Sequence, residues 1–315
     1  MIRAENLTKR FGDVMAVDGL SFEIPVGQIV GFLGPNGAGK TTTMRLLTAY
    51  LPADAGRAVV MDLDVAEHPL EVRRRLGYLP ENNPLHENLE VTEALHFVGR
   101  LRGLGDDAAR KDRVKAVIKT CGLGGVVGRK TGELSKGYRQ RLGLAAAIIH
   151  DPDVLILDEP TSGLDPNQVH EVRDLIRELK KEKTLLLSTH ILSEVQAVCD
   201  RVIILNAGKI AADGTPDELS GSLQNKNRLH LALKGPTDQF RPALEALPGA
   251  LAVTAPAGEE FVVESEASVD LREEVFRLAS SKGWPIMHLS LERLSLEDVF
   301  RKLTADAPVD GGEGR

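Results

Sequence analysis

One stretch, residues 29–47, constrains the fold of this chain more than any other part of its sequence. Residues 29–33 form an apolar run typical of a buried strand, and residues 42–47 have the pattern of a helix start. The segment between them fits the phosphate-loop pattern and consists of Gly34, Pro35, Asn36, Gly37, Ala38, Gly39, Lys40 and Thr41. A strand, loop and helix in this order predict an α/β fold with a nucleoside triphosphate site at the turn.

The chemistry of this loop follows from its residue types. Glycines let backbone N–H groups close around phosphate oxygens, and Lys40 adds a mobile positive charge. The helix directs its positive N-terminal end at the anion, and the hydroxyl of Thr41 or of Thr42 can reach a Mg²⁺ ion. The alternative is a glycine-rich turn before an ordinary helix, which the preceding strand and following helix disfavour.

Composition and charge narrow the class of protein. The 315 residues suggest two domains, and 42% apolar with 27% charged residues are typical of a globular protein. The net charge of -7 argues against nucleic acid as the main partner, because basic side chains are not in excess. Cys121 and Cys199 lie far apart, so we expect two buried free thiols. We also expect no targeting segment, and no membrane span because the apolar runs fall far below about 20 residues.

The N-terminal residues 2–27 alternate apolar and polar side chains, which predicts an antiparallel sheet with turns at residues 12–13 and 18–19. Phe11 stands at the first turn, either as an anchor for the loop or as a platform for a base. A further strand is expected at residues 57–61. The strand that precedes Glu81 ends there because proline interrupts a ladder.

A helical insertion, residues 82–150, is expected within this strand-rich domain. Apolar residues recur at helical spacing from residue 92 to about 121, with a break at residues 103–105. Residues 122–132 are predicted to be a loop. Ser135 is a favoured N-cap residue and opens a helix through residue 149, in which Gly137 lets the backbone approach a ligand closely.

Two carboxylates, Asp158 and Glu159, follow the next buried strand, residues 154–157. Paired acids after a strand are commonly a solvated turn, but ligands bind at this edge of an α/β sheet. With a phosphate loop nearby, Asp158 would hold Mg²⁺ through water and Glu159 would polarise the attacking water. A helix at residues 166–181, a strand at residues 184–188 and a hairpin within residues 202–213 follow. His190 ends the second strand at the same edge.

With these motifs in this order along the chain, the first 220 or so residues resemble the nucleotide-binding subunit of ABC transporters. Besides the phosphate loop, the matching motifs are residues 134–138 for the signature segment, residues 154–159 for the strand with the catalytic glutamate, residues 162–165 for the D-loop with Asp165, and His190 for the switch histidine. The chain looks most like the gliding-motility and multidrug-exporter ATPase branch. The resemblance implies a P-loop NTPase core with an antiparallel β subdomain and a helical insertion.

The resemblance also implies a mechanism that needs two chains. Two subunits, either identical copies or homologous ATPase subunits, pair head to tail, and each ATP lies between one phosphate loop and the opposite signature segment. Ser135 and the Gly137 amide would contact the γ-phosphate across this interface. His190 would orient that phosphate, and Phe11 would stack on adenine. ATP closes the dimer, hydrolysis at Glu159 releases it, and the motion drives a separate transmembrane permease subunit.

Three positions depart from the usual residues of the family. Glu81 stands where glutamine is usual, and it joins Thr41 and Asp158 as an implied Mg²⁺ ligand that adds negative charge there. Lys136 takes the place of glycine at the third signature position, where its long side chain would help or hinder contact with phosphate. Phe11 replaces a commoner tyrosine, which preserves stacking.

The C-terminal part carries no catalytic pattern. Residues 221–227 are polar and predict a linker that ends the ATP-binding domain, residues 1–220. The patterns beyond it predict β, α, β, β, α and β elements at residues 228–233, 240–247, 251–254, 260–264, 269–282 and 285–289. This order suits a small α+β, ferredoxin-like domain, closed by a helix at residues 296–303. The accessory domain would cover residues 228–304, with a dimer-stabilising or regulatory role, and residues 305–315 would be a disordered tail.

Three functions compete. The first is an ATPase subunit that powers a separately encoded membrane exporter, in the cytoplasm and held at the inner face of the cell membrane by that partner. The second is a non-transport ABC-type ATPase acting on nucleic acid or ribosomes, whose relatives usually carry long coiled-coil insertions or two ATPase domains. The third, a binding-only module, is disfavoured because Lys40, Asp158, Glu159 and His190 are all present.

Overall fold

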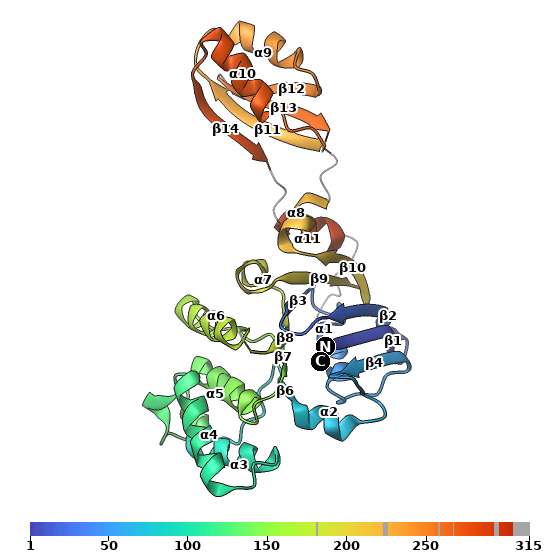
Figure 1. Cartoon of the computed structure of the whole chain (residues 1–315), viewed down its shortest axis with the longest axis vertical. Helices are drawn as coiled ribbons and strands as arrows, with labels where there is room; N and C mark the ends of the chain where they lie inside the picture. Colours follow the sequence, from blue (N-terminus) through green and yellow to red (C-terminus); the bar gives the residue numbers. More distant parts are fainter. Residues whose placement is uncertain (181, 223–225, 258, 267, 293–295, 305–315) are drawn as a thin grey trace, which may run out of the picture. The chain divides into compact units, whose positions relative to one another are not determined.

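The computed structural model of the chain describes residues 1–180, 182–222, 226–257, 259–266, 268–292 and 296–304. It divides into two compact units, one formed by Met1–Pro216 with the segment from Lys302 onwards, the other by Asp217–Arg301. Figure 1 labels the elements of both units. Each unit has its own hydrophobic core. None of the described helices combines the length and apolar character that a bilayer span requires.

The larger unit is built on a six-stranded sheet in the order β10-β9-β3-β8-β7-β6. The strands are β3 (Ile29–Leu33), β6 (Leu76–Leu79), β7 (Val154–Asp158), β8 (Thr184–Thr189), β9 (Arg201–Asn206) and β10 (Lys209–Gly214). All pairs are parallel except the hairpin of β9 with β10. Every residue of β3, β7 and β8 is buried, as apolar strands covered on both faces require. The carboxyl ends of these three neighbours therefore meet at one edge.

Helices α3, α4 and α5 pack on one another as the predicted helical insertion (Figure 1). The helices of the larger unit are α1 (Lys40–Leu47), α2 (Pro69–Arg75), α3 (Val91–Leu101), α4 (Asp107–Thr120), α5 (Lys136–Ile148), α6 (Pro166–Lys180) and α7 (Leu192–Val198). The predicted break at residues 103–105 lies between α3 and α4. The predicted loop at residues 122–132 is wrong in part, because short 3₁₀ turns form at η1 (Gly124–Val126) and η2 (Thr131–Glu133).

A second sheet of the larger unit is antiparallel, in the order β2-β1-β4-β5. Its strands are β1 (Ile2–Phe11), β2 (Val14–Ile24), β4 (Ala55–Val60) and β5 (Leu63–Asp64). The predicted turn at residues 12–13 joins β1 to β2. The predicted turn at residues 18–19 is wrong, because both residues lie inside β2 where its register against β1 shifts. Gly19 has a φ of 63°, and its N–H donates to Thr8 Oγ1 at 3.1 Å, so the glycine forms a bulge instead of a turn.

The smaller unit has the predicted βαββαβ order and an antiparallel sheet in the order β12-β13-β11-β14. Its elements are β11 (Lys226–Leu233), α9 (Thr237–Glu245), β12 (Ala250–Ala257), β13 (Glu260–Glu266), α10 (Arg272–Lys282) and β14 (Ile286–Glu292). Phe240 is fully buried in its core, with ring centroids 4.6 Å from Trp284 and 5.8 Å from Phe261. Edge-on aromatic pairs of this kind add stability beyond the area that they bury.

Two further helices, α8 (Pro216–Ser222) and α11 (Leu296–Thr304), lie where the chain passes between the units. At the end of α11, Asn206 Nδ2 of the larger unit donates to Leu303 O at 3.0 Å. The predicted linker at residues 221–227 contains the end of α8 and the start of β11, and residues 223–225 lie outside the described residues. The predicted disordered tail at residues 305–315 also lies outside them.

Candidate functional site

A cavity of about 640 Å³ lies where the loop after β3 meets the ends of β7 and β8. Ten of the predicted site residues line it, namely Asn36, Gly37, Ala38, Gly39, Lys40, Thr41, Thr42, Glu81, Glu159 and His190. Gly34 and Pro35 lie behind Lys40 and accept its hydrogen bonds. The folded sheet therefore gathers phosphate-loop, carboxylate and histidine groups from four separate segments around one space.

The phosphate loop reaches its shape through left-handed glycines. Gly37 and Gly39 have φ values of 79° and 99°, which cost glycine nothing and strain other residues. A Cβ on Gly39 would lie only 2.4 Å from Ala16 O of β2. Gly39 is also the N-cap of α1, so the loop and the positive end of the helix approach the cavity together.

Lys40 is the buried cation of the cavity. Its Nζ donates to Gly34 O at 2.7 Å and to Pro35 O at 3.0 Å. Burial lowers the pKa of Lys40, and the negative charges of Glu159, Asp158 and Glu81 oppose that shift. Three of the four predicted carboxylates thus act electrostatically on this one ammonium group. Such a charge, aimed at a polar cavity, suits an anionic ligand.

Asp158 carries an unpartnered buried oxygen. The residue is fully buried, and its Oδ1 accepts from Ser188 Oγ at 2.6 Å and from Thr41 Oγ1 at 3.2 Å. Its Oδ2 makes no hydrogen bond with the described part of the chain. A bare buried carboxylate oxygen is costly, and together with a neighbouring hydroxyl it fits a Mg²⁺ ion that keeps several waters. Exposed Glu81 lines the same cavity.

Glu159 and His190 form a direct pair at the cavity wall. Glu159 Oε2 lies 3.0 Å from His190 Nδ1, and the glutamate is only 8% exposed. Glu159 also has a φ of 49°, a strained value for a residue with a side chain. Its backbone N–H donates to Ser188 Oγ at 3.0 Å, which fixes this turn. The carboxylate is therefore held in one place, as a general base needs to be.

Seven predicted site residues do not line the cavity. Gly34, Pro35 and Asp158 are hydrogen-bonded to lining residues, as described above. The other four are Phe11, Ser135, Gly137 and Asp165. Phe11 is 47% exposed, with Lys9 Nζ 5.7 Å from its ring centroid. Ser135 Oγ caps α5 by accepting from Tyr138 N at 3.4 Å. Asp165 Oδ1 accepts from the N–H of Gln168, in the first turn of α6, at 3.0 Å.

Several residues of the site were not predicted. Val14 and Ala16 line the cavity, and Val14 is the register partner of Phe11. Ser162 also lines it; the predicted D-loop contains this serine, but no role was predicted for its side chain. Ser188 bonds both Asp158 and the Glu159 backbone. The sequence did indicate a site position for Ser188. It is a polar residue near the carboxyl end of an apolar strand, and ligands bind at that edge of the sheet.

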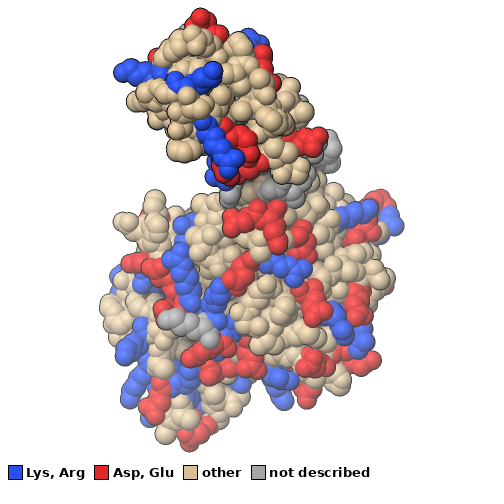
Figure 2. All heavy atoms as spheres, turned by 45° about the horizontal axis from the view of Figure 1, so that its top comes forward, with Lys and Arg blue, Asp and Glu red and all other residues tan. Residues whose placement is uncertain are grey.

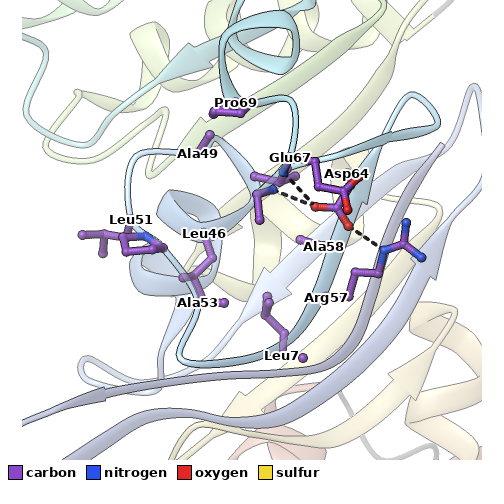
Figure 3. Close-up of a pocket in the computed structure, with 14 residues that line it drawn as sticks. Leu7, Leu46, Ala49, Leu51, Ala53, Arg57, Ala58, Asp64, Glu67 and Pro69 are labelled. Carbon is purple, nitrogen blue, oxygen red and sulfur yellow. Dashed lines mark hydrogen bonds and ion pairs between the residues drawn. The ribbon is translucent and has the colours of Figure 1, made fainter.

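A second cavity, of about 430 Å³, lies between the end of α1, β4 and the start of α2 (Figure 3). Its lining is mainly apolar. Arg57 Nε donates to Asp64 Oδ2 at 2.5 Å, and Asp64 Oδ1 accepts the backbone N–H groups of Ala66 and Glu67. The figure shows these bonds at the rim, where both oxygens of the carboxylate are engaged. The reactive groups are therefore gathered at the first cavity.

Comparison with known proteins finds the same kind of protein each time, described as an ABC transporter or named as an ATP-binding protein or subunit. Residues 17–162 match the family model described as ABC transporter. The chain is 38% identical over 313 residues to the daunorubicin/doxorubicin resistance ATP-binding protein DrrA of Streptomyces peucetius, covering 98% of this chain and 93% of that protein. It is 40% identical over 300 residues to the Nod factor export ATP-binding protein I of Burkholderia lata, covering 95% of each. A solved ATP binding subunit of an ABC transporter, 29% identical, matches with a TM-score of 0.64 over 70% of this chain and 92% of that one.

Proposed function

The chain belongs to the ABC transporter family of ATP-binding subunits, and from this we propose that it powers a separate membrane exporter by pairing head to tail with a second copy of itself. It is an ATP-binding ATPase. The observation that carries the proposal is that Lys40 and the Glu159–His190 pair line one cavity. Directly behind its Thr41 lies Asp158, which has an unpartnered buried oxygen.

The proposed roles follow from the geometry of the cavity. Lys40 and the loop amides would hold the phosphates, and Thr41 with Asp158 would hold a Mg²⁺ ion. Glu81 lines the same cavity as Thr41 and is the third proposed ligand. A bound Mg²⁺ would neutralise charge that builds up on the phosphate oxygens. Glu159 takes a proton from the attacking water, and His190 keeps the carboxylate and the γ-phosphate in register.

The proposal of a pair of chains rests on where the remaining predicted residues lie. Ser135 and Gly137 stand at the start of α5 and do not line the cavity of their own chain. A second copy in head-to-tail orientation would bring its own Ser135 and Gly137 amide to the γ-phosphate, and Asp165 to the interface. Phe11, exposed on the turn beside Val14, would stack on the adenine.

The proposal of export rests on the relatives, which are named as ATP-binding proteins of drug resistance and of Nod factor export. Both match over nearly the whole of this chain. We therefore propose that the chain powers export of a molecule that a separate transmembrane permease selects. The ATPase would then work in the cytoplasm, held at the inner face of the membrane by that permease.

The second candidate, an ABC-type ATPase acting on nucleic acid or ribosomes, has less support. The chain carries a net charge of -7. Acidic and basic side chains are interspersed over the larger unit on the face shown in Figure 2, where a nucleic-acid surface would gather basic ones. The named export relatives also favour the first candidate.

The Glu159→Gln variant tests the proposed function. It keeps the groups that bind ATP and removes the carboxylate that accepts a proton, so turnover should fall by about 10²-fold or more. ATP should then trap a dimer that light scattering after gel filtration detects, while ADP leaves monomers. A variant that turns over ATP normally, or stays monomeric with ATP, would overturn the proposal.

A further inference from the structure

A buried carboxylate that no predicted motif contains, Glu194 of α7, joins the two segments that carry the reactive pair. Glu194 is 4% exposed. One of its oxygens accepts from Thr161 Oγ1, and the other accepts from Thr189 Oγ1 at 2.7 Å. Both threonines are buried as well. Glu194 thus bridges the two threonine hydroxyls in one network. The residues that follow them, Ser162 and His190, line the cavity.

Each of the two threonines lies close in sequence to one residue of the reactive pair. Thr161 lies two residues after Glu159, and Thr189 directly precedes His190. The Oγ1 of Thr189 also accepts from Ile191 N at 3.0 Å, which fixes the turn after β8. The Glu194 carboxylate therefore connects the segment after β7 to the segment after β8, on either side of the 3.0 Å contact between Glu159 and His190.

The charge balance of the network argues against a purely structural role. Within the described part of the chain, the hydrogen-bond partners of the Glu194 carboxylate are two neutral hydroxyl groups. Burying a carboxylate on neutral donors alone is costly, and an apolar side chain of similar size would pack there at lower cost. What a carboxylate offers instead is two acceptor oxygens at a fixed separation, so that two hydroxyls are held in one geometry.

We propose that Glu194 is a positioning residue for ATP hydrolysis, which holds Glu159 and His190 in register through Thr161 and Thr189. The inference rests on the proposed roles of Glu159 and His190. It gives α7 a role in the chemistry, because a shift of this helix would move both segments at once. Displacing a reacting group by about 1 Å can cost about 10²-fold in rate.

The test compares three isosteric variants, Thr161→Val, Thr189→Val and Thr184→Val. Thr184 is the matched control, because it is a buried threonine at the other end of β8 whose Oγ1 accepts from Gly27 N at 2.9 Å. Thr161→Val and Thr184→Val each remove one side-chain hydrogen bond, whereas Thr189→Val removes two, to Glu194 and from Ile191 N. We expect kcat to fall about 10-fold to 10²-fold in the first two, with KM for ATP within about 3-fold. The control should keep kcat within about 2-fold, although its melting temperature falls about as far as that of Thr161→Val, which also loses one bond.

Two further variants separate positioning from stability. Thr161→Ser and Thr189→Ser keep the hydroxyl, so each should restore most of the lost turnover. Glu194→Gln keeps the size of the side chain but offers only one acceptor oxygen, and it should lower kcat without preventing folding. Thr189→Val should add little to Glu194→Gln, because both act through the same bonds.

The outcomes are distinct. If Thr161→Val, Thr189→Val and Glu194→Gln all turn over ATP like the Thr184→Val control while Glu159→Gln is inactive, the positioning role is wrong and the proposed function stands. If Glu159→Gln also turns over ATP normally, the proposed function fails. Should a valine variant fail to fold, the kcat of Glu194→Gln decides the question alone.

Discussion

Two glycines of the phosphate loop should respond very differently to the same substitution. Gly37 and Gly39 both have left-handed backbone angles, so alanine at either position costs about 1–2 kcal/mol of backbone strain. A Cβ on Gly37 meets nothing within 4 Å, whereas a Cβ on Gly39 would lie 2.4 Å from Ala16 O, a backbone atom. A backbone atom cannot relieve the clash by changing rotamer, so overpacking at Gly39 adds about 1–3 kcal/mol to the loss of stability. We expect a loss of about 1–2 kcal/mol for Gly37→Ala and of about 2–5 kcal/mol for Gly39→Ala.

The assay is urea unfolding followed by far-UV circular dichroism. Fluorescence would be misleading, because the one tryptophan of the chain, Trp284, belongs to the smaller unit. Nucleotide affinity is measured alongside, and Gly39→Ala should lose it because the loop cannot keep its shape. Gly12→Ala is the matched control, since Gly12 has a φ of 57°, meets nothing within 4 Å and lies on the turn between β1 and β2.

The control should match Gly37→Ala in stability and the unaltered protein in nucleotide affinity. A Gly39→Ala variant as stable as Gly37→Ala would refute the reasoning, because the contact between the loop and β2 would then not be as close as the backbone geometry requires.

Two other predictions concern buried titrating groups. Burial lowers the pKa of His150 from 6.5 to about 4, so the fold requires the neutral ring. Stability should therefore fall as the pH drops from about 6.5 towards 4, by about 2 kcal/mol after allowance for partial exposure, and thermal melts of His150→Gln should show a flatter pH profile. Burial also raises the pKa of the Cys121 thiol to about 12 and raises that of Cys199. Both free thiols should resist a thiol reagent at pH 8 and react once urea unfolds the chain.

The sequence predicts those site residues whose place follows from the segment of chain around them, either a continuous loop or the end of a buried strand. The phosphate loop is continuous in sequence, so its residues lie together once the strand and helix form. Glu159 and His190 stand 31 residues apart, yet both follow buried parallel strands and must meet at one edge. Their positions after these two strands predicted the edge of the sheet where both line the same cavity as Lys40.

What the sequence did not predict depends on packing between segments. Gly19 resembles a turn residue, and only pairing against β1 shows that it forms a bulge. The seven residues of α7 are too short for a clear periodicity, and no side chain caps the helix start. Glu194 was therefore missed, and so was its network with Thr161 and Thr189, because a hydrogen bond between side chains 33 residues apart leaves no pattern in the sequence.

The most direct test of the central claim, that each site is completed by a second copy, mixes two inactive variants. Lys40→Ala removes the cation of the phosphate loop, and Ser135→Arg blocks the signature segment. In a mixed head-to-tail dimer, one site combines both defects while the other is intact. Each variant alone should be inactive, and an equal mixture should recover about a quarter of the normal ATPase rate, since half of the dimers are mixed and each has one working site. A mixture as inactive as its components, or a Ser135→Arg variant with full activity, would contradict the claim.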